Sequence, residues 1–358
     1  MSMNYQDCLK VLASKTRTER LNGLEIKIKP VPESDRHGIP DEREAAWMRR
    51  TQNSLGKNVL IEDMTLLTRE DIQGLRNAMG CENQDLSENM ITSHRVIKTE
   101  YGNIPLWIYT PCGTKQRPLV VYFHGGGFFG GTTRVVENAC KLLAERSEAV
   151  VISVDYVLAP EYRFPKGLLQ CWETVQWAYA NAGALNIDPT KIAVSGDSAG
   201  GNLAAACCLL DRKRMIKLQL LLYPAVIAES FTKYGWTEDA YEMNEDIEIL
   251  KFMVNDIKRS AGLLEKIYPK YPTDCYNQLY SPYLASNYAD FPETFIAVPE
   301  YDFLRQQAEK FSVRLVQSGV PVHFYRYSGM AHAFFEHTGE FPQAEDCTNE
   351  MAKLIKAM

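Results

Sequence analysis

The feature that most constrains this chain is a serine between two glycines, set where an apolar run gives way to a helix-forming run. Residues 191–195 read Lys-Ile-Ala-Val-Ser, as expected for a short buried strand, and Gly196-Asp197-Ser198-Ala199-Gly200 follows directly. Residues 202–210 are mostly alanine, leucine and cysteine and favour a helix. In this context the G-x-S-x-G pattern predicts a nucleophile elbow, a sharp turn that exposes the Ser198 hydroxyl. Glycine is expected on both sides because the turn leaves no room for a β-carbon.

A second glycine-rich turn, His124-Gly125-Gly126-Gly127, follows another apolar run at residues 119–123. A phosphate-binding loop explains it poorly, because neither G-x-G-x-x-G spacing, nor a P-loop lysine, nor an acidic ribose partner accompanies it. Glycines here would instead let backbone N–H groups come within about 3 Å of a developing oxyanion. We predict that the amides of Gly126, Gly127 and Ala199 form an oxyanion hole, and that His124 holds the loop rather than moving protons.

A nucleophilic serine needs a base to take its proton and an acid to orient that base. In folds with this elbow the acid and then the histidine follow the serine along the chain, on loops after late strands. Asp302 follows an apolar run at residues 295–298, and His332 follows one at residues 322–325. We therefore predict that Ser198, Asp302 and His332 form a catalytic triad. Three other side chains stay open as candidates: Glu300 for the acid, and His323 or His337 for the base.

From residue 96 onward, strand-like runs alternate with helical stretches, which is typical of a mostly parallel sheet covered on both faces. The eight candidate strands are residues 96–98, 106–109, 119–123, 150–154, 192–195, 219–222, 295–298 and 322–325. Helices are expected at residues 135–145, 168–181, 202–211 and 306–317. We predict an α/β fold with an eight-stranded, mostly parallel sheet and helices on both faces.

Two stretches do not follow this alternation, and we expect both to contribute to a helical cap. The first is charged and helical in character, and the second separates the sixth candidate strand from the seventh and carries an amphipathic helix near residues 247–257. Aromatic residues of the second stretch, Trp236 and Tyr241 among them, could either fasten it to the core or line a substrate pocket. The predicted division is residues 1–93 for an N-terminal segment of the cap, 94–227 and 280–358 for the catalytic core, and 228–279 for a cap insertion.

Composition and charge narrow the functional classes. With 45 acidic and 39 basic residues the chain carries a net charge of −6 and no basic tract, which argues against nucleic-acid binding. We expect no membrane span and a cytoplasmic location, because long apolar runs and a signal-peptide core are both missing. Nine cysteines at irregular spacing indicate neither a disulfide framework nor a metal motif. We expect a small-molecule substrate, no cofactor and no metal, and we leave a homo-oligomer open.

Together these motifs resemble the hormone-sensitive-lipase-like carboxylesterases, a branch of the α/β-hydrolase superfamily. The resemblance extends over roughly residues 96–336. It rests on ordered motifs: His124 to Gly127, Asp155 to Glu161 with Phe164-Pro165, Gly196 to Gly201, Tyr223-Pro224, Asp302 with Leu304, and His332 with Phe334. The resemblance implies the same triad and oxyanion loop as those predicted above. It also implies an α/β-hydrolase fold, a cap built from the N-terminal segment and the insertion, and a preference for short to medium acyl chains.

The function predicted from these residues is hydrolysis of carboxylic esters by a cofactor-free serine esterase that forms an acyl-enzyme intermediate. An amidase or a peptidase could use the same triad, so that alternative stays open. A non-catalytic binding protein with a hydrolase-like fold is a further alternative, which the presence of all three triad residues disfavours. Three positions depart from the family pattern: Val157 where arginine is common, Glu300 where glycine is usual, and Gln306 in place of an acidic residue.

Overall fold

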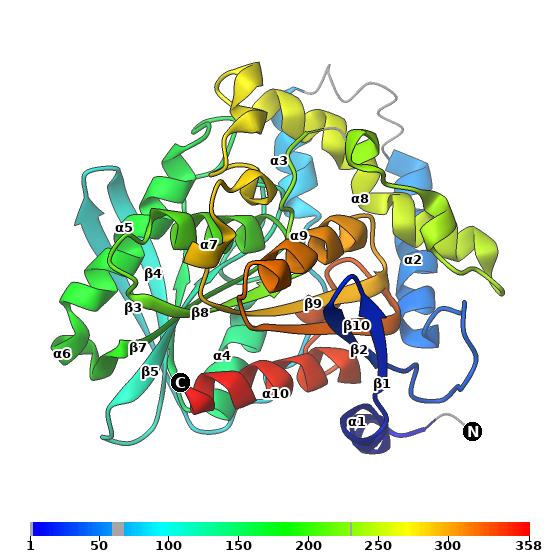
Figure 1. Ribbon diagram of the computed structural model, residues 1–358, viewed down its shortest axis with the longest axis horizontal. Helices are drawn as coiled ribbons and strands as arrows, with labels where there is room; N and C mark the ends of the chain where they lie inside the picture. The colour runs from blue at the N-terminus through cyan, green and yellow to red at the C-terminus, as the bar shows by residue number, and fades with distance from the viewer. Residues whose placement is uncertain (1–2, 59–67, 230) are drawn as a thin grey trace.

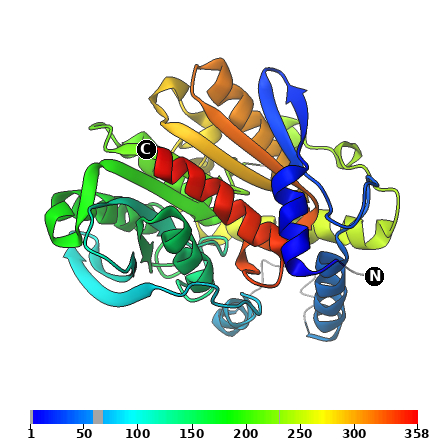
Figure 2. The ribbon, with the colours of Figure 1, turned by 90° about the horizontal axis from the view of Figure 1, so that it is seen from below.

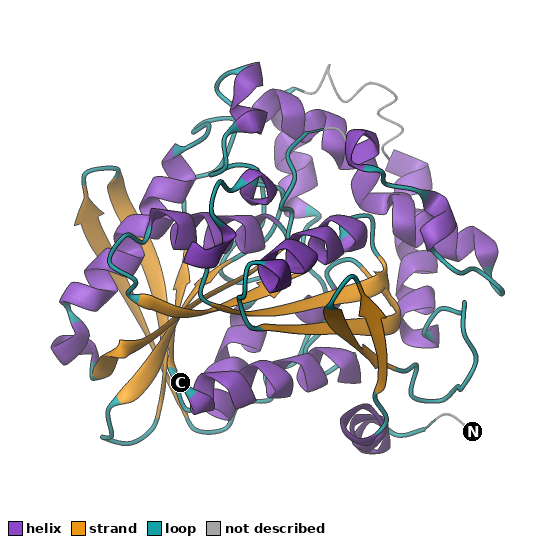
Figure 3. Ribbon diagram, viewed as in Figure 1, coloured by secondary structure: helices purple, strands orange, loops and turns teal. Residues whose placement is uncertain are grey.

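A ten-stranded sheet crosses the middle of the molecule, with helices above and below it (Figure 1, Figure 3). The structure is a computed structural model that describes residues 3–58, 68–229 and 231–358. The strands are β1 (Arg17–Leu21), β2 (Leu24–Lys29), β3 (Met90–Thr99), β4 (Gly102–Pro111), β5 (Arg117–Phe123), β6 (Val150–Val154), β7 (Ile187–Asp197), β8 (Ile216–Leu222), β9 (Glu293–Tyr301) and β10 (Val322–Ala331). All eight predicted strands are present, as β3 to β10.

The strand order is β1-β2-β10-β9-β8-β7-β5-β6-β4-β3. Every neighbouring pair from β2 to β6 in this order is parallel, whereas β1, β4 and β3 are added antiparallel at the two edges. Central strands such as β6 are buried along their whole length, which fits their unbroken runs of valine and isoleucine. The predicted α/β class with a mostly parallel sheet is confirmed.

Two further strands lie in the N-terminal segment that we expected to belong to the cap. β1 and β2 form a hairpin through Asn22-Gly23, whose φ angles are 48° and 93°, and β2 pairs parallel with β10. The expected strand count of eight is therefore wrong, and so is a cap role for this part of the segment. The physical reason is that apolar residues occur at every second position, as in a strand with one buried face. Leu24, Ile26 and Ile28 are buried on that face, and charged residues alternate with them.

Helices cover both faces of the sheet, and the two main hydrophobic clusters lie between them and the strands. One face carries α5 (Lys166–Ala180), the short α6 (Ala182–Leu185), α7 (Ala199–Leu210) and α9 (Arg305–Gln317). The other face carries α4 (Glu137–Ser147) and α10 (Pro342–Ala357), and α1 (Tyr5–Ser14) packs beside α10 (Figure 2). The four helices predicted for the core correspond to α4, α5, α7 and α9.

Three more helices lie beyond the same end of the molecule in Figure 1, with α3 (Arg69–Asn77) near the top centre and α2 (Glu42–Asn58) and α8 (Ile247–Ile267) in contact with each other to its right. The helix expected near residues 247–257 is α8. Met48 of α2 and Leu250 of α8 share a hydrophobic cluster with Tyr301 at the end of β9. Short 3₁₀ turns complete the fold: η2 (Phe231–Tyr234), η3 (Glu238–Ala240), η4 (Pro272–Tyr276), η5 (Pro282–Leu284), η6 (Tyr288–Asp290) and η7 (Phe334–Glu336). None of the helices in the described ranges is long and apolar enough to span a membrane.

Candidate active site

Four strands of the parallel part of the sheet deliver the predicted site residues to one edge of the sheet. β5, β7, β9 and β10 are mutually parallel, so their carboxyl ends meet at that edge. The loop that starts at His124 follows β5, and Ser198 follows β7. Asp302 follows β9, and His332 follows β10. Residues that are more than two hundred positions apart in the chain therefore come together through the topology of the sheet.

Ser198 occupies the turn between β7 and α7 in a backbone conformation that side chains rarely adopt, with φ 53° and ψ −116°. Its N–H donates to the Leu222 carbonyl on β8 over 2.8 Å, which holds the turn against the sheet. A β-carbon at Gly196 would collide with the backbone of Gly200, and one at Gly200 would collide with the Phe123 carbonyl. The turn therefore requires glycine on both sides, as predicted, and fixes the serine at the N-terminus of α7, where the helix dipole favours negative charge.

The three side chains predicted to form a triad are in contact. Ser198 Oγ donates to His332 Nε2 over 3.0 Å, and His332 Nδ1 donates to Asp302 Oδ2 over 2.8 Å. The other carboxylate oxygen of Asp302 accepts the N–H of Leu304 over 2.7 Å, so both oxygens are held. The ring of Tyr223 packs against the His332 ring, with centroids 4.8 Å apart. Because Asp302 is fully buried and Ser198 only partly so, the network meets the outside at its serine end.

The other candidates for acid and base make different contacts. Glu300 accepts a backbone N–H of β10 over 2.9 Å, and burial raises its pKa. His323 contacts a glutamate on the neighbouring strand over 2.8 Å. His337 is packed between two aromatic rings, and burial lowers its pKa to about 4. Of the predicted residues, the fold therefore brings Asp302 and His332 to the serine.

The loop predicted to form the oxyanion hole lines the same pocket as Ser198. Gly126 and Gly127 have φ angles of 106° and 59°, a region that favours glycine. Within the described residues, no acceptor takes a hydrogen bond from the amide of either glycine. Ala199 is the first residue of α7, so its N–H has no partner inside the helix. His124 donates from Nδ1 to the Gly125 carbonyl, and burial lowers its pKa to about 4, which leaves a neutral ring that holds the loop.

Asp197 ties the two glycine-rich turns together, a role that its place in the motif does not reveal. Its Oδ1 accepts the Tyr122 hydroxyl over 2.9 Å and the Gly125 N–H over 3.0 Å. A β-carbon at Gly125 would collide with this carboxylate, so only glycine fits there. Burial raises the pKa of Asp197 to about 6. The only sequence signal for this contact would have been an acidic residue within an otherwise apolar elbow.

The loop that carries Asp302 is fastened to residues 236–242 of the insertion, which we call the strap. Tyr241 on the strap donates its hydroxyl to the Asp302 carbonyl over 2.8 Å. The side-chain amide of Gln306 exchanges two hydrogen bonds with the backbone of Thr237, over 2.7 and 3.2 Å. Trp236 and Tyr241 are not among the residues that line the pocket, so of the two roles left open for these aromatics, fastening agrees with the structure.

These contacts account for the positions that depart from the family pattern. Gln306 bonds the strap, and Glu300 bonds β10. Val157 donates its N–H to a glutamine side chain of α5 and brings no charge to this region. The ion-pair partner of nearby Glu161 is Arg76, which comes from α3. In this chain, Arg76 therefore holds α3 against Glu161, and Gln306 holds the loop of Asp302 against the strap.

The site opens into a pocket of about 990 Å³. Helices α2, α3 and α8, the glycine-rich loop that follows β5, and η7 all contribute to its walls. Large apolar side chains on those walls are Met79, Phe128, Phe129, Leu264 and Phe303. Among the residues that the structure describes, no group of three or more His, Cys, Asp or Glu is arranged to hold a metal ion.

The sequence of this chain is similar to those of known proteins. A family model described as alpha/beta hydrolase fold matches residues 120–336. An arylesterase of Saccharolobus solfataricus is 38% identical over 240 residues, which are 66% of this chain and 75% of the relative. The carboxylesterase NlhH of Mycobacterium tuberculosis is 32% identical over 265 residues, 72% of this chain and 79% of the relative.

Solved structures agree with the sequence relatives. One titled as an arylesterase has a TM-score of 0.71 and 30% identity, and the match covers 89% of this chain and 98% of that one. The predicted α/β-hydrolase fold is therefore confirmed. The chain belongs to the α/β-hydrolases, in the hormone-sensitive-lipase-like branch that its motifs predict.

Proposed function

We propose that this chain hydrolyses carboxylic esters through an acyl-enzyme formed on Ser198. His332 Nε2 takes the proton of Ser198 Oγ as that oxygen attacks the ester carbonyl, and Asp302 stabilises the imidazolium through Nδ1. The imidazolium gives its proton to the departing alcohol. Water, deprotonated by the same ring, then attacks the acyl-enzyme and releases the carboxylic acid.

The observation that carries this proposal is the continuous set of contacts from Asp302 Oδ2 through His332 to Ser198 Oγ, at 2.8 and 3.0 Å. Both distances are within hydrogen-bond reach, as a base and its orienting acid require. Gly126 and Gly127 line the same pocket as Ser198, and within the described part of the chain their N–H groups have no acceptor. Such donors stabilise the negative oxygen of a tetrahedral intermediate.

The family and its relatives make this chain a carboxylic ester hydrolase. A preference for short to medium acyl chains is our finer proposal. It is supported by a pocket of about 990 Å³ with aromatic and aliphatic walls, which includes Ser198 in its lining and has room for an ester of that size. The expected partner is thus a small-molecule ester.

We also propose that α2, α3 and residues 228–279 act together as the cap, with residues 94–227 and 280–358 as the catalytic core. Support comes from the pocket, to which all three cap helices contribute, and from the hydrophobic cluster that α2 and α8 share. The cytoplasmic location and the homo-oligomer left open above stay predictions from the sequence.

The test of the nucleophile is Ser198→Ala. Turnover of a short-chain aryl ester should fall by about 10⁴-fold or more, because the attacking oxygen is gone. A fluorophosphonate probe should label the wild type at Ser198 and leave the variant unlabelled. Ser195→Ala is a matched control, since that hydroxyl is buried in β7 and donates to the Leu220 carbonyl. Labelling of Ser198→Ala at another serine would refute the mechanism.

An amidase or peptidase would use the same residues. A mutation therefore cannot distinguish these activities from an esterase, but a comparison of substrates can. A matched pair of an aryl ester and the corresponding anilide, measured with the same enzyme preparation, gives the ratio of the two kcat/KM values. We expect the ester to be preferred by several orders of magnitude. A ratio near one would favour the amidase.

A further inference from the structure

Arg76 on α3 reaches from the cap to two loops of the core. Its guanidinium donates through Nε to the Phe129 carbonyl over 2.5 Å and through Nη2 to the Ala159 carbonyl over 2.7 Å. Nη1 and Nη2 also donate to the Glu161 carboxylate, over 3.0 and 2.6 Å. One side chain therefore joins the cap both to the oxyanion loop and to the segment that follows β6.

Phe129 belongs to the same tight turn as the two glycines of the oxyanion loop. The N–H groups of Phe129 and Gly130 both donate to the Gly126 carbonyl, over 3.1 and 2.8 Å. That carbonyl and the N–H of Gly127 are parts of one planar peptide unit. Holding Phe129 in place therefore fixes the direction in which the Gly127 N–H points.

The turn is enclosed by the same elements that Arg76 joins. On the cap side, a β-carbon at Gly130 would collide with Met79, which follows α3. On the core side, the N–H of Ala159 donates to the Phe128 carbonyl over 2.9 Å. Arg76 donates hydrogen bonds to the carbonyl groups of both Phe129 and Ala159. It therefore links the turn to α3 on one side and to the segment around Ala159 on the other.

We propose that Arg76 is a positioning residue that holds the oxyanion loop, and through it the Gly127 amide, where the tetrahedral oxygen forms. This inference rests on the proposed function, because it presumes that this amide belongs to the oxyanion hole. Arg76 touches no reacting atom and acts through the turn. Its planar fork of five donors can serve two carbonyls and a carboxylate at once, which a lysine ammonium cannot do in the same geometry.

The test is Arg76→Ala, assayed with a short-chain aryl ester. Removing one oxyanion donor outright costs about 10²- to 10³-fold in kcat, so displacing the donors should cost about 10- to 100-fold. KM should stay within about two-fold, because the interaction that is lost belongs to the transition state. A purely structural role for Arg76 would lower the amount of folded enzyme without this separation of kcat from KM.

A second measurement reports directly on the oxyanion. A trifluoromethyl ketone adds to the catalytic serine as a hemiketal oxyanion, whereas the product alcohol binds without one. In Arg76→Ala the affinity for the ketone should fall by the same factor as kcat/KM, and the affinity for the alcohol should stay unchanged. Equal losses for both ligands would overturn the proposal, because they would indicate a general disturbance of the pocket.

Two further variants separate the contacts of Arg76. Glu161→Gln removes the ion pair but leaves both carbonyl contacts, so kcat should stay within about two-fold of the wild type. Arg76→Lys keeps the positive charge and most of the side-chain stem, and it replaces the alanine variant if that fails to fold. It should still lose several-fold in kcat. An unchanged kcat in Arg76→Lys and Arg76→Ala, or a loss in Glu161→Gln as large as in Arg76→Ala, would contradict the proposal.

Failure of the proposed function would look different. If the wild type is not labelled at Ser198 by a fluorophosphonate, the mechanism itself is wrong. If the wild type is labelled and the Arg76 variants keep full kcat and full ketone affinity, the mechanism stands and only the role of Arg76 is refuted.

Discussion

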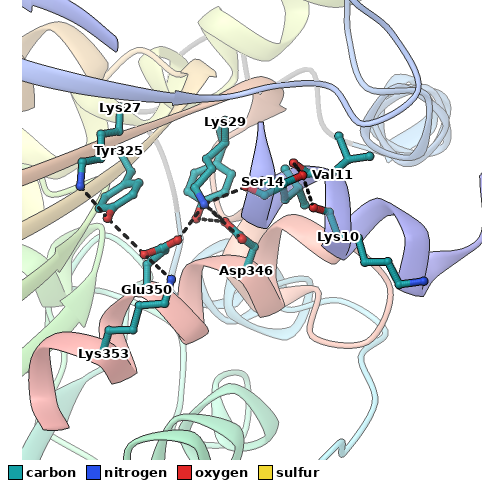
Figure 4. A network of polar contacts seen from close by, with 11 residues as sticks. Lys10, Val11, Ser14, Lys27, Lys29, Tyr325, Asp346, Glu350 and Lys353 are labelled. Atoms are coloured by element: carbon teal, nitrogen blue, oxygen red, sulfur yellow. Dashed lines mark hydrogen bonds and ion pairs between the residues drawn. The ribbon is translucent and has the colours of Figure 1, made fainter. Parts of the chain in front are cut away.

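Two buried networks in this molecule both pair carboxylates with a nitrogen-bearing side chain, but only one of them is open to the pocket that Ser198 lines. The first, for which we propose the catalytic role and which we call the catalytic network, joins Ser198, His332 and Asp302 at the carboxyl ends of the strands. The second network joins Lys29 of β2 to Asp346 and Glu350 of α10, and we call it the lysine anchor (Figure 4). The catalytic network meets the pocket at the serine, whereas the Lys29 side chain is 1% exposed and does not line that pocket.

The lysine anchor has no unused bonding capacity at its centre. Lys29 Nζ has three donors, and it contacts the Leu12 carbonyl of α1 over 3.0 Å in addition to the two carboxylates. Burial disfavours its charge, but Asp346 and Glu350 outweigh burial and raise its pKa. A buried charged network can take part in a reaction when one of its ends is open to a ligand. When every donor of the buried cation is bonded within the protein, as in the lysine anchor, the network holds segments of the chain together.

The largest expected effect comes from breaking the catalytic network at its buried end. In Asp302→Asn the amide can hold the His332 ring in the wrong tautomer, so kcat should fall by about 10⁴-fold. The free energy of unfolding should change little, because asparagine has the same shape. Glu300→Gln is the matched control and should keep kcat within a few-fold. If Glu300→Gln lost more activity than Asp302→Asn, the acid would be Glu300.

The lysine anchor should respond in the reverse way. Lys29→Met leaves the Asp346 and Glu350 carboxylates buried without their cation, and breaking such a pair costs about 3–5 kcal/mol of unfolding free energy. The kcat of the folded enzyme should stay within about two-fold. Lys27→Met makes the same chemical change two residues away, at a half-buried position, and should cost no more than about 1 kcal/mol. Urea unfolding and steady-state kinetics on the same preparations give both quantities.

A smaller effect concerns the pH dependence of that loss. Burial acts to raise the pKa of Glu350, but bonds from Lys29 outweigh it and lower the pKa below its usual value of 4.5. A carboxylate with a lowered pKa stabilises the fold above its unfolded pKa, and this stability is lost as the pH falls through the folded pKa. The difference in unfolding free energy between wild type and Lys29→Met should therefore be full at pH 7 and smaller near pH 4. A gap independent of pH would contradict this account.

The same comparison shows what the sequence could and could not predict. The catalytic network was predictable because each part has a local signal: an elbow with glycines around Ser198, and polar residues at strand ends for Asp302 and His332. The buried core strands were predictable because they are apolar on both faces. The predicted strands, and the predicted contacts of Ser198, Asp302 and His332, are therefore found where the sequence carries a short-range pattern.

The lysine anchor has no such signal, because its partners lie more than three hundred positions apart along the chain. Lys29 reads as one more charge in a charged segment, and β1 is an exposed edge strand whose residues look equally suited to a helix. The Asn22-Gly23 pair, followed by alternating apolar residues, is typical of a β-hairpin. The prediction that residues 1–93 belong to the cap did not take this pattern into account. Arg76, Asp197 and Tyr241 also act across long separations, and their roles emerge only from the fold.

The smallest expected effect tests whether the strap that fastens the acid loop belongs to the catalytic network or is only an anchor. Tyr241→Phe removes the hydrogen bond to the Asp302 carbonyl and should cost about 1 kcal/mol of unfolding free energy. Tyr288→Phe removes an equally buried hydroxyl-to-carbonyl bond, 2.7 Å long, that lies outside the pocket walls, and should cost the same. If the strap positions Asp302, only Tyr241→Phe should also lower kcat, by a few-fold and with KM unchanged, because a small displacement of the acid misaligns His332. Equal kcat values in the two variants would show that the strap, like the lysine anchor, stabilises the fold without affecting catalysis.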